Sequence, residues 1–364
     1  MRAITGQVTR EIQDYLGETP IDRADAFPIS TYRKLVEQVA KLSYFNKDYL
    51  LFYRGQGIDY RNRAGASTFY PTIYRGDYIP QREMTNRFKI LESAADKLRE
   101  IFEKEKFEGY SEFIDQTHVQ WGVLQHYGVC STPLFDLTHS LRVACSFAQM
   151  EAQGGYGYVY VFGMPYITHR ISHNSEHYLF NVRLLSICPP EALRPYFQEG
   201  YLAGTEDITD KYRNKEVLDF RNRLIAKFQI PSQVRFWGDG FSKIPASVLY
   251  PRGDRIEKLC TELKFDYKSQ FKSGELGDFL VEWAELENYL LEFGRNREER
   301  VLSIGETINV LPEIRPVEKD TVSQLHDLRK FRNVLVHEPN KITTDDIEKQ
   351  IVELLSVKQQ IGLN

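Results

Sequence analysis

The feature that most constrains the fold is a change in sequence pattern at residues 260–273. Before it, the chain is rich in tyrosine, glycine and proline and contains apolar runs of strand length at residues 49–53 and 158–162. After it, apolar residues recur at helical spacing to the end of the chain. The segment between is polar and charged, as linkers between domains often are. The sequence therefore predicts an α+β domain, a mixed sheet with helices, followed by an all-α helical bundle.

The second domain is predicted to contain three helices separated by a long loop. One helix spans about residues 276–293, a second runs from Val322 to His337, and a third is capped near Thr343. Residues 294–318 contain two glycines and two prolines and are predicted to be a loop. The expected apolar positions of the first and third helices are Phe279, Leu280, Trp283, Leu286, Leu290, Phe293, Ile347, Ile351, Leu354 and Leu355.

Residues 332–337 of the second helix carry a pattern suited to phosphodiester chemistry. Pro339 ends the helix, so His337 lies in the last turn, where the helix dipole favours the imidazolium. Such a histidine can act as acid or base on an RNA 2′-hydroxyl, while Arg332 stabilises phosphate charge and Asn333 orients the group. Projection of the helix places Arg332 in an apolar arc bordered by His326, Arg329, Asn333 and His337. The alternative is a structural ion pair between Arg332 and an acidic residue of a neighbouring helix.

The motif Arg332-x4-His337, with Asn333 directly after the arginine, resembles that of the HEPN family. These are small helical domains whose nuclease members carry an R-x4-6-H motif. The resemblance implies that residues 270–364 form a HEPN-like bundle with Arg332, Asn333 and His337 as catalytic residues. It also implies a homodimer in which two motifs form one RNA-cleaving cleft without metal or cofactor. Some members of the family keep the fold without cutting RNA.

The first domain has a separate group of polar residues beside its predicted strands. Arg54 follows the run at residues 49–53 and is expected to emerge at a strand end, where Gly55 and Gly57 let a ligand approach the backbone. His126 ends a helical stretch, and Asp136 lies in the loop that follows. The alternatives are structural: His126 and its neighbour as a helix cap with buried rings, Asp136 as a loop anchor, and an Arg54–Asp136 salt bridge.

These residues resemble the FRG domain family, over about residues 30–265. The family is named for a Phe/Tyr-Arg-Gly motif, and the chain matches its elements in order. The matches are Tyr53-Arg54-Gly55-Gln56, Pro71-x3-Arg75, Gln125-His126-Tyr127-Gly128 through Asp136-Leu137-Thr138 to Ala148, Arg194-x3-Gln198-x-Gly200 and Leu249-Tyr250-Pro251. The chain departs from the pattern by one additional residue between His126 and Asp136. Residues 1–29 are then expected to form an N-terminal helical extension.

The order of these motifs is similar to that of ADP-ribosyltransferase-like folds. The resemblance implies that Arg54 holds phosphates, that Thr138 or Ser140 contacts ribose, and that Gln198 occupies the place of a late acidic residue. Glutamine lacks the anionic charge that glycosidic cleavage needs, so nucleotide binding is preferred to NAD-dependent transfer. The residues implied to bind NAD or another nucleotide are Arg54, Gly55, Gln56, His126, Tyr127, Asp136, Thr138, Ser140 and Gln198.

Charge and cysteine usage narrow the class of protein. From Asp266 onward the chain has 19 acidic and 13 basic residues, a balance of −6, and the part before has 32 and 34, a balance of +2. The predicted nuclease domain is therefore expected to contact phosphates locally and not to bind nucleic acid nonspecifically over a broad basic surface. The chain lacks an apolar signal core and a membrane-length apolar run, and its four cysteines lack CxxC spacing. A cytoplasmic protein without structural zinc is expected.

Three functional hypotheses follow from the sequence. In the first, the chain is a toxin or phage-defence effector whose dimeric HEPN-like domain cuts RNA while the FRG domain binds a nucleotide or signal. In the second, the FRG domain is an ADP-ribosyltransferase or NAD-consuming enzyme, and the helical domain only dimerises. In the third, the chain is a non-catalytic binding protein. RNA, a nucleotide and a second copy of the chain are the expected partners, whereas DNA and a membrane are not.

Overall fold

The computed structural model describes residues 1–76, 79–212, 214–251, 253–269, 275–295, 302–337, 342 and 344–363. Within these ranges, the side chains of residues 82, 264–269, 275–277, 293–295, 337 and 344 lie outside the description. The chain divides into two compact units, Met1–Leu263 and Lys264–Asn364. The division falls within helix α9 (Arg255–Ser269), so the polar stretch between the two sequence patterns is helical up to Ser269.

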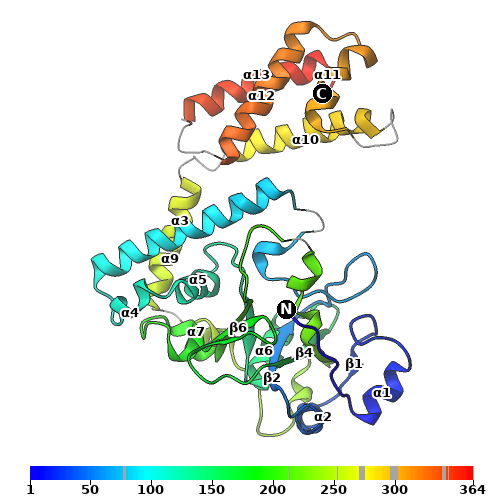
Figure 1. Ribbon diagram of the computed structural model, residues 1–364, viewed down its shortest axis with the longest axis vertical. Helices are drawn as coiled ribbons and strands as arrows, with labels where there is room; N and C mark the ends of the chain where they lie inside the picture. The colour runs from blue at the N-terminus through cyan, green and yellow to red at the C-terminus, as the bar shows by residue number, and fades with distance from the viewer. Residues whose placement is uncertain are drawn as a thin grey trace. The chain divides into compact units, whose positions relative to one another are not determined.

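The first unit is built on one mixed sheet, and its class is α+β (Figure 1). Among the described residues the sheet has eight strands in the order β1-β8-β4-β2-β3-β7-β6-β5. Neighbouring strands are antiparallel except β1 and β8, which are parallel. The strands are β1 (Phe27–Pro28), β2 (Leu50–Gln56), β3 (Phe135–Thr138), β4 (Tyr156–Met164), β5 (Ile171–Asn174), β6 (Leu179–Val182), β7 (Gly200–Thr205) and β8 (Leu224–Pro231).

Helices and loops cover the two faces of this sheet. Helix α6 packs on β2 and β4, and its residues Ala144 and Ala148 share a buried core with Leu51 and Val161. A second buried cluster contains Phe52 together with the aromatic rings of Phe69, Phe135, Tyr160, Phe162, Tyr201 and Phe220. The helices of this unit before α9 are α1 (Arg10–Leu16), α2 (Tyr32–Phe45), α3 (Gln81–Glu105), α4 (Tyr110–Ile114), α5 (Thr117–His126), α6 (Leu141–Met150), α7 (Leu193–Phe197) and α8 (Ala246–Leu249).

The N-terminal residues belong to the first unit and do not form a separate extension. Helix α1 buries Ile12 and Leu16 in the core beneath α6, and β1 adds a parallel strand to the sheet through Phe27. The main-chain N–H of Ile4 donates to the carbonyl of Asn222 at 2.9 Å. Residues 1–29, expected to form an N-terminal helical extension, thus contain helix α1 and belong to the first unit.

The second unit is a helical bundle (Figure 1). Its described helices are α10 (Glu275–Arg295), α11 (Ile304–Ile314), α12 (Lys319–His337) and α13 (Thr344–Gln360). The predicted helices are confirmed, and Phe279, Trp283, Leu286 and Leu290 of α10 are buried in one core as expected. On α13 the expectation fails at Leu355, which is 45% exposed. The predicted positions Phe293 and Thr343 lie outside the described side chains.

Helix α11 corrects the predicted loop at residues 294–318. Ser303 caps the helix and exchanges hydrogen bonds with Glu306 in a capping box, while Ile308 and Leu311 are buried. Pro312 lies near the C-terminal end, where its missing N–H removes one hydrogen bond that the packed face offsets. The sequence was misread because glycine and proline were given more weight than the apolar spacing between them.

Candidate functional site

A pocket opens where the central strands β2 and β3 separate. These strands pair only at Tyr53 and Thr138, although each continues beyond that point. The pocket has a volume of about 320 Å³, within the range of small-ligand sites. The lining residues are Tyr53, Arg54, Gly55, Gln56, Tyr60, Arg75, Gln125, His126, Asp136, Leu137, Thr138, Phe147, Glu151, Gln198, Gly200 and Tyr250.

Arg54 spans the gap between the two strands. Its Nη1 donates to the main-chain oxygen of Asp136 at 2.8 Å and lies 3.7 Å from the Oδ2 of the same residue. The guanidinium lies over the ring of Phe135, 4.8 Å from its centroid. Its side chain is 16% exposed, and its Nε is buried without a hydrogen-bond partner. The salt bridge to Asp136 considered from the sequence is therefore present, and it leaves guanidinium N–H groups for a ligand.

The sequence expectation for the surroundings of Arg54 was wrong in two respects. Arg54 lies inside β2, not at its end, because the strand continues to pair with β4 through Gln56. Gly55 serves helix packing: a Cβ atom there would lie 1.8 Å from the main-chain oxygen of Ala144 in α6. Gly57 is likewise covered by the carbonyl of Glu151. The glycines let α6 approach the strand, which places Phe147 and Glu151, near the C-terminal end of α6, beside the pocket.

His126 is held in one tautomer by Gln198. The Gln198 Nε2 donates to the carbonyl of Leu249 at 2.9 Å, so its Oε1 faces the His126 Nδ1 at 3.1 Å as an acceptor. The Nδ1 atom therefore carries the proton, and the neutral ring has its lone pair on Nε2. Gly200 makes room for the ring, since a Cβ there would lie 3.1 Å from it.

The Nε2 of His126 points at Asp136, 3.7 Å from its Oδ1. Both atoms are buried, and neither has a hydrogen-bond partner. Burial lowers the pKa of His126 below 6.5, against the opposing effects of Asp136 and of the Gln198 hydrogen bond. Asp136 is 39% exposed and belongs to β3, where it pairs with Leu202, so the predicted loop position is corrected. The Asp136 carboxylate is partly exposed in the pocket, and the buried ring of His126 lies beside it.

Arg75 joins the pocket as a second cation, which the sequence reading quoted in a motif without assigning it to the site. Its Nε donates to the main-chain oxygen of Tyr70 at 3.1 Å. The residue is exposed at the mouth, yet desolvation of its guanidinium lowers its pKa, and the positive charge of Arg54 lowers it further. Asp136 and Tyr60 oppose this shift. Two arginines thus share one pocket, whose lining also contains the carboxylate residues Asp136 and Glu151.

The structure brings together most of the residues predicted to bind a nucleotide. Seven of the nine line the pocket: Arg54, Gly55, Gln56, His126, Asp136, Thr138 and Gln198. The other two have structural contacts. Tyr127 is buried, and its hydroxyl donates to Asp254, while the Ser140 hydroxyl caps α6 by accepting from the main chain of Val143. The expected helix end at Tyr127 is confirmed, with Gly128 in the left-handed region.

Eight further lining residues were not assigned to the site from the sequence, among them Tyr60, Gln125, Glu151 and Tyr250. Tyr60 lies in the loop after β2, and Glu151 is the C-cap of α6; nothing in the sequence pattern links either residue to Arg54. Gln125 and Tyr250 stood within quoted motifs, next to His126 and before Pro251, so the motif boundaries carried a usable signal. The amide Nε2 of Gln125 and the amide Oε1 of Gln56 are buried without partners, which leaves one donor and one acceptor at the pocket wall.

In the second unit, Arg332 and Asn333 lie on α12 with partly buried side chains. The Arg332 Nη1 donates to the Oδ1 of Asn333 at 3.4 Å, and its Nε is buried without a partner. His337 is the last residue of α12, and its side chain lies outside the described residues, as do Glu338 and Pro339. The rest of the predicted polar stripe faces α11: His326 Nε2 lies 2.8 Å from the Oδ1 of Asn309.

Comparisons with known proteins add no family. The scan against protein-family models found no match, and neither the search of curated proteins nor the search of solved structures found one. In the described part of the chain, no helix has the length and apolar character needed to cross a membrane. The same part contains no group of three or more histidine, cysteine or acidic side chains placed to hold a metal ion.

Proposed function

We propose that the first unit binds a nucleotide through a phosphate group held by Arg54 and Arg75. The observation that carries this proposal is Arg54 itself: it is largely buried, oriented by the main chain of Asp136, and has an Nε without a partner. Two guanidinium groups that share a pocket repel each other, and a phosphate offsets that repulsion while accepting charge-assisted hydrogen bonds. Asp136 and Thr138 are then placed to accept hydrogen bonds from ribose hydroxyls.

Equilibrium binding of AMP and ADP-ribose to the full chain tests this proposal. We expect Arg54→Ala to weaken binding at least tenfold, and Arg54→Lys to restore little, because an ammonium cannot make the bidentate contact. The control is Arg10→Ala, whose side chain is 94% exposed. Unchanged affinity in Arg54→Ala, or the absence of binding to any phosphate-bearing probe, would contradict the proposal.

The same geometry limits what is proposed for the chemistry of this pocket. In the ADP-ribosyltransferase-like reading, Gln198 stands where an acidic residue would assist glycosidic cleavage. Both atoms of its amide are engaged, one by Leu249 and the other by His126. A residue held in this way orients His126 and does not supply negative charge to a transition state. The proposal for the first unit is therefore binding, and NAD-consuming activity is left as a sequence expectation.

We propose as a second function that the helical unit cleaves RNA as a homodimer, with Arg332, Asn333 and His337 as the residues that act. The observation that favours it is the buried, unpartnered Nε of Arg332. The alternative structural ion pair is not found among the residues described: the hydrogen bond of Arg332 there goes to the adjacent Asn333. A guanidinium in this state has capacity for a phosphate.

RNA cleavage by the purified full chain tests the second function. We expect His337→Ala and Arg332→Ala each to abolish RNA cleavage. The molar mass of each variant, measured by light scattering, should remain that of a dimer. The matched control is His326→Ala on the same helix, whose ring contacts Asn309. Cleavage retained in His337→Ala, or a monomeric wild-type protein, would reject the assignment. The two proposals together describe a toxin- or phage-defence-type effector in which a nucleotide-binding unit accompanies an RNA-cleaving one.

A further inference from the structure

A second pocket adjoins the first and shares three residues with it. Its volume is about 450 Å³, and Gln56, Tyr60 and Arg75 line both pockets. Within the described residues, its lining contains three cationic side chains and no acidic one. The residues that line only the second pocket are Arg61, Asn62, Thr68, Phe69, Tyr70, Gly76, Phe135 and Lys215.

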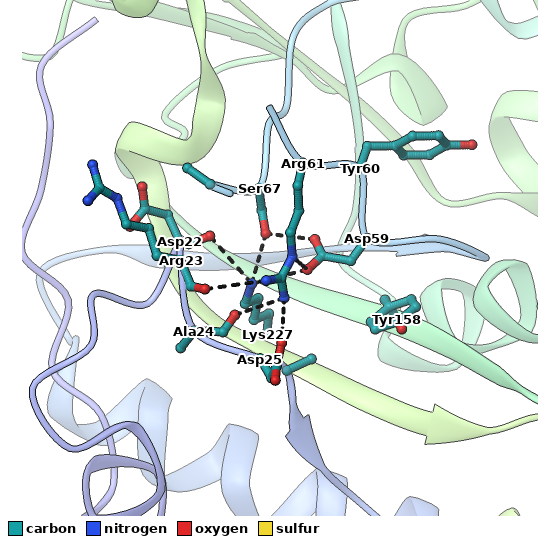
Figure 2. Close-up of polar contacts among 12 residues, drawn as sticks. Asp22, Arg23, Ala24, Asp25, Asp59, Tyr60, Arg61, Ser67, Tyr158 and Lys227 are labelled. Atoms are coloured by element: carbon teal, nitrogen blue, oxygen red, sulfur yellow. Dashed lines mark hydrogen bonds and ion pairs between the residues drawn. The ribbon is translucent and has the colours of Figure 1, made fainter. Parts of the chain in front are cut away.

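One wall of the second pocket is a loop, residues 57–69, that a buried polar cluster fixes to the sheet. Figure 2 shows Asp59 and Ser67 beside Lys227, whose side chain is fully buried on β8, with Arg61 bound to the same Asp59. Lys227 Nζ donates to Asp59 at 3.1 Å and to Ser67 at 2.8 Å. Arg61 Nε donates to the same carboxylate at 2.9 Å. The loop is thus held before any ligand arrives, which lowers the conformational cost of binding.

The same cluster determines where Tyr60 points. Its neighbours Asp59 and Arg61 turn inward to the cluster, whereas the ring of Tyr60 points away from it (Figure 2). Tyr60 is 57% exposed and lines both pockets, so its ring is an accessible surface at their junction. Gln56 lies at the same junction with its amide oxygen buried and unpartnered. An aromatic face beside a free acceptor suits a nucleobase, which stacks and donates N–H groups.

We propose that the two pockets form one site for a dinucleotide, with its linking phosphate at Arg75 and its two nucleosides in the separate pockets. This inference rests on the proposed nucleotide binding and extends it to the class of ligand. Each pocket is of a size that holds one small-molecule moiety. Arg75 is the cation common to both pockets, and the second pocket adds Arg61, which is paired with Asp25 and Asp59, and Lys215, which donates to the carbonyl of Gly76. A phosphate at the junction satisfies Arg75, and the second base lies against Tyr60.

Binding of AMP is compared with binding of two dinucleotides, pApA with a 3′–5′ phosphodiester and NAD with a pyrophosphate linkage. The wild-type chain is expected to bind one of them at least tenfold more tightly than AMP. Tyr60→Ala, which removes the stacking face, and Thr68→Trp, which fills the second pocket, should each bring that ratio close to one. Thermal melting identifies a variant that fails to fold, and Arg10→Ala is the control for both.

The possible outcomes distinguish failure of the dinucleotide inference from failure of the proposed nucleotide binding. If AMP binds in an Arg54-dependent manner but neither dinucleotide gains affinity, the inference is overturned and the proposed function stands. A gain that persists in both folded variants also overturns it, because the second pocket would then not hold the second nucleoside. If none of the three ligands binds, the proposed function itself fails. The dinucleotide that binds more tightly than AMP identifies whether the site accepts a phosphodiester or a pyrophosphate linkage.

Discussion

The buried ion pair of Lys227 and Asp59 allows a direct test of how the ligand site is held. Lys227 is fully buried and Asp59 is 6% exposed. Lys227→Met keeps a similar side-chain length and removes the charge. Asp59 then keeps three donors, which are the hydroxyls of Ser67 and Tyr160 and the guanidinium of Arg61. Only the last of these carries a positive charge, so the variant leaves a buried carboxylate less well compensated.

The expected cost follows from that remaining compensation. Removal of one partner of a buried ion pair costs about 3–5 kcal/mol, because the other charge stays buried. We expect the lower end, about 3 kcal/mol, since the charged Arg61 still donates to Asp59. For a unit of this length, roughly 2–4 °C is lost per kcal/mol, so the melting temperature of the first unit should fall by about 6–12 °C.

Differential scanning calorimetry of the full chain measures this change, with fluorescence of Trp121 and Trp237 to assign the transition of the first unit. The control is Lys41→Met, which breaks an ion pair between side chains that are 51% and 61% exposed and should cost at most about 1 kcal/mol. Asp59→Asn and the double variant complete a mutant cycle with Lys227→Met. Wild-type melting in Lys227→Met, or strictly additive effects in the cycle, would refute the reasoning.

Three further predictions concern other parts of the molecule. Gly55→Ala should cost about 1–3 kcal/mol in thermal melting, because the added carbon meets the backbone of α6; a variant as stable as wild type would mean that α6 can shift. The lowered pKa of His126 means that the unfolded state binds more protons between the folded-state pKa and 6.5, so stability should fall on acidification below pH 6.5. His126→Gln should weaken that pH dependence in melting curves, and an unchanged slope would count against the assignment. Ser303→Ala should lower the stability of the second unit by about 1 kcal/mol in urea unfolding, and no change would show that the capping box of α11 contributes nothing.

The sequence was most informative where local pattern decides structure. Helices α10, α12 and α13 follow from apolar spacing within one segment, and the cap of α6 follows from Ser140 before an apolar run. Strand pairing joins distant segments, so it has no comparable local signal. The inference that Arg54 ends its strand failed for this reason: Gly55 and Gln56 look like a turn until their pairing with Val159 and Tyr158 is known.

The same limit applies to the pocket: the sequence indicates several of its residues, but their arrangement depends on how the strands pair. Arg54 was found because an arginine after a buried strand is unusual, whereas His126, Asp136 and Gln198 were assigned through the motifs that resemble the FRG family. Their relation to one another depends on β2 and β3 separating after a single pair, and nothing in either strand's sequence encodes that separation. Arg54 occupies the gap and replaces the missing main-chain contact with a hydrogen bond to the Asp136 carbonyl. The residue proposed to bind the phosphate therefore also bridges β2 and β3, so a loss of affinity in Arg54→Ala has to be compared with a melting curve. Arg54→Lys with normal melting separates the proposed phosphate contact from the structural one.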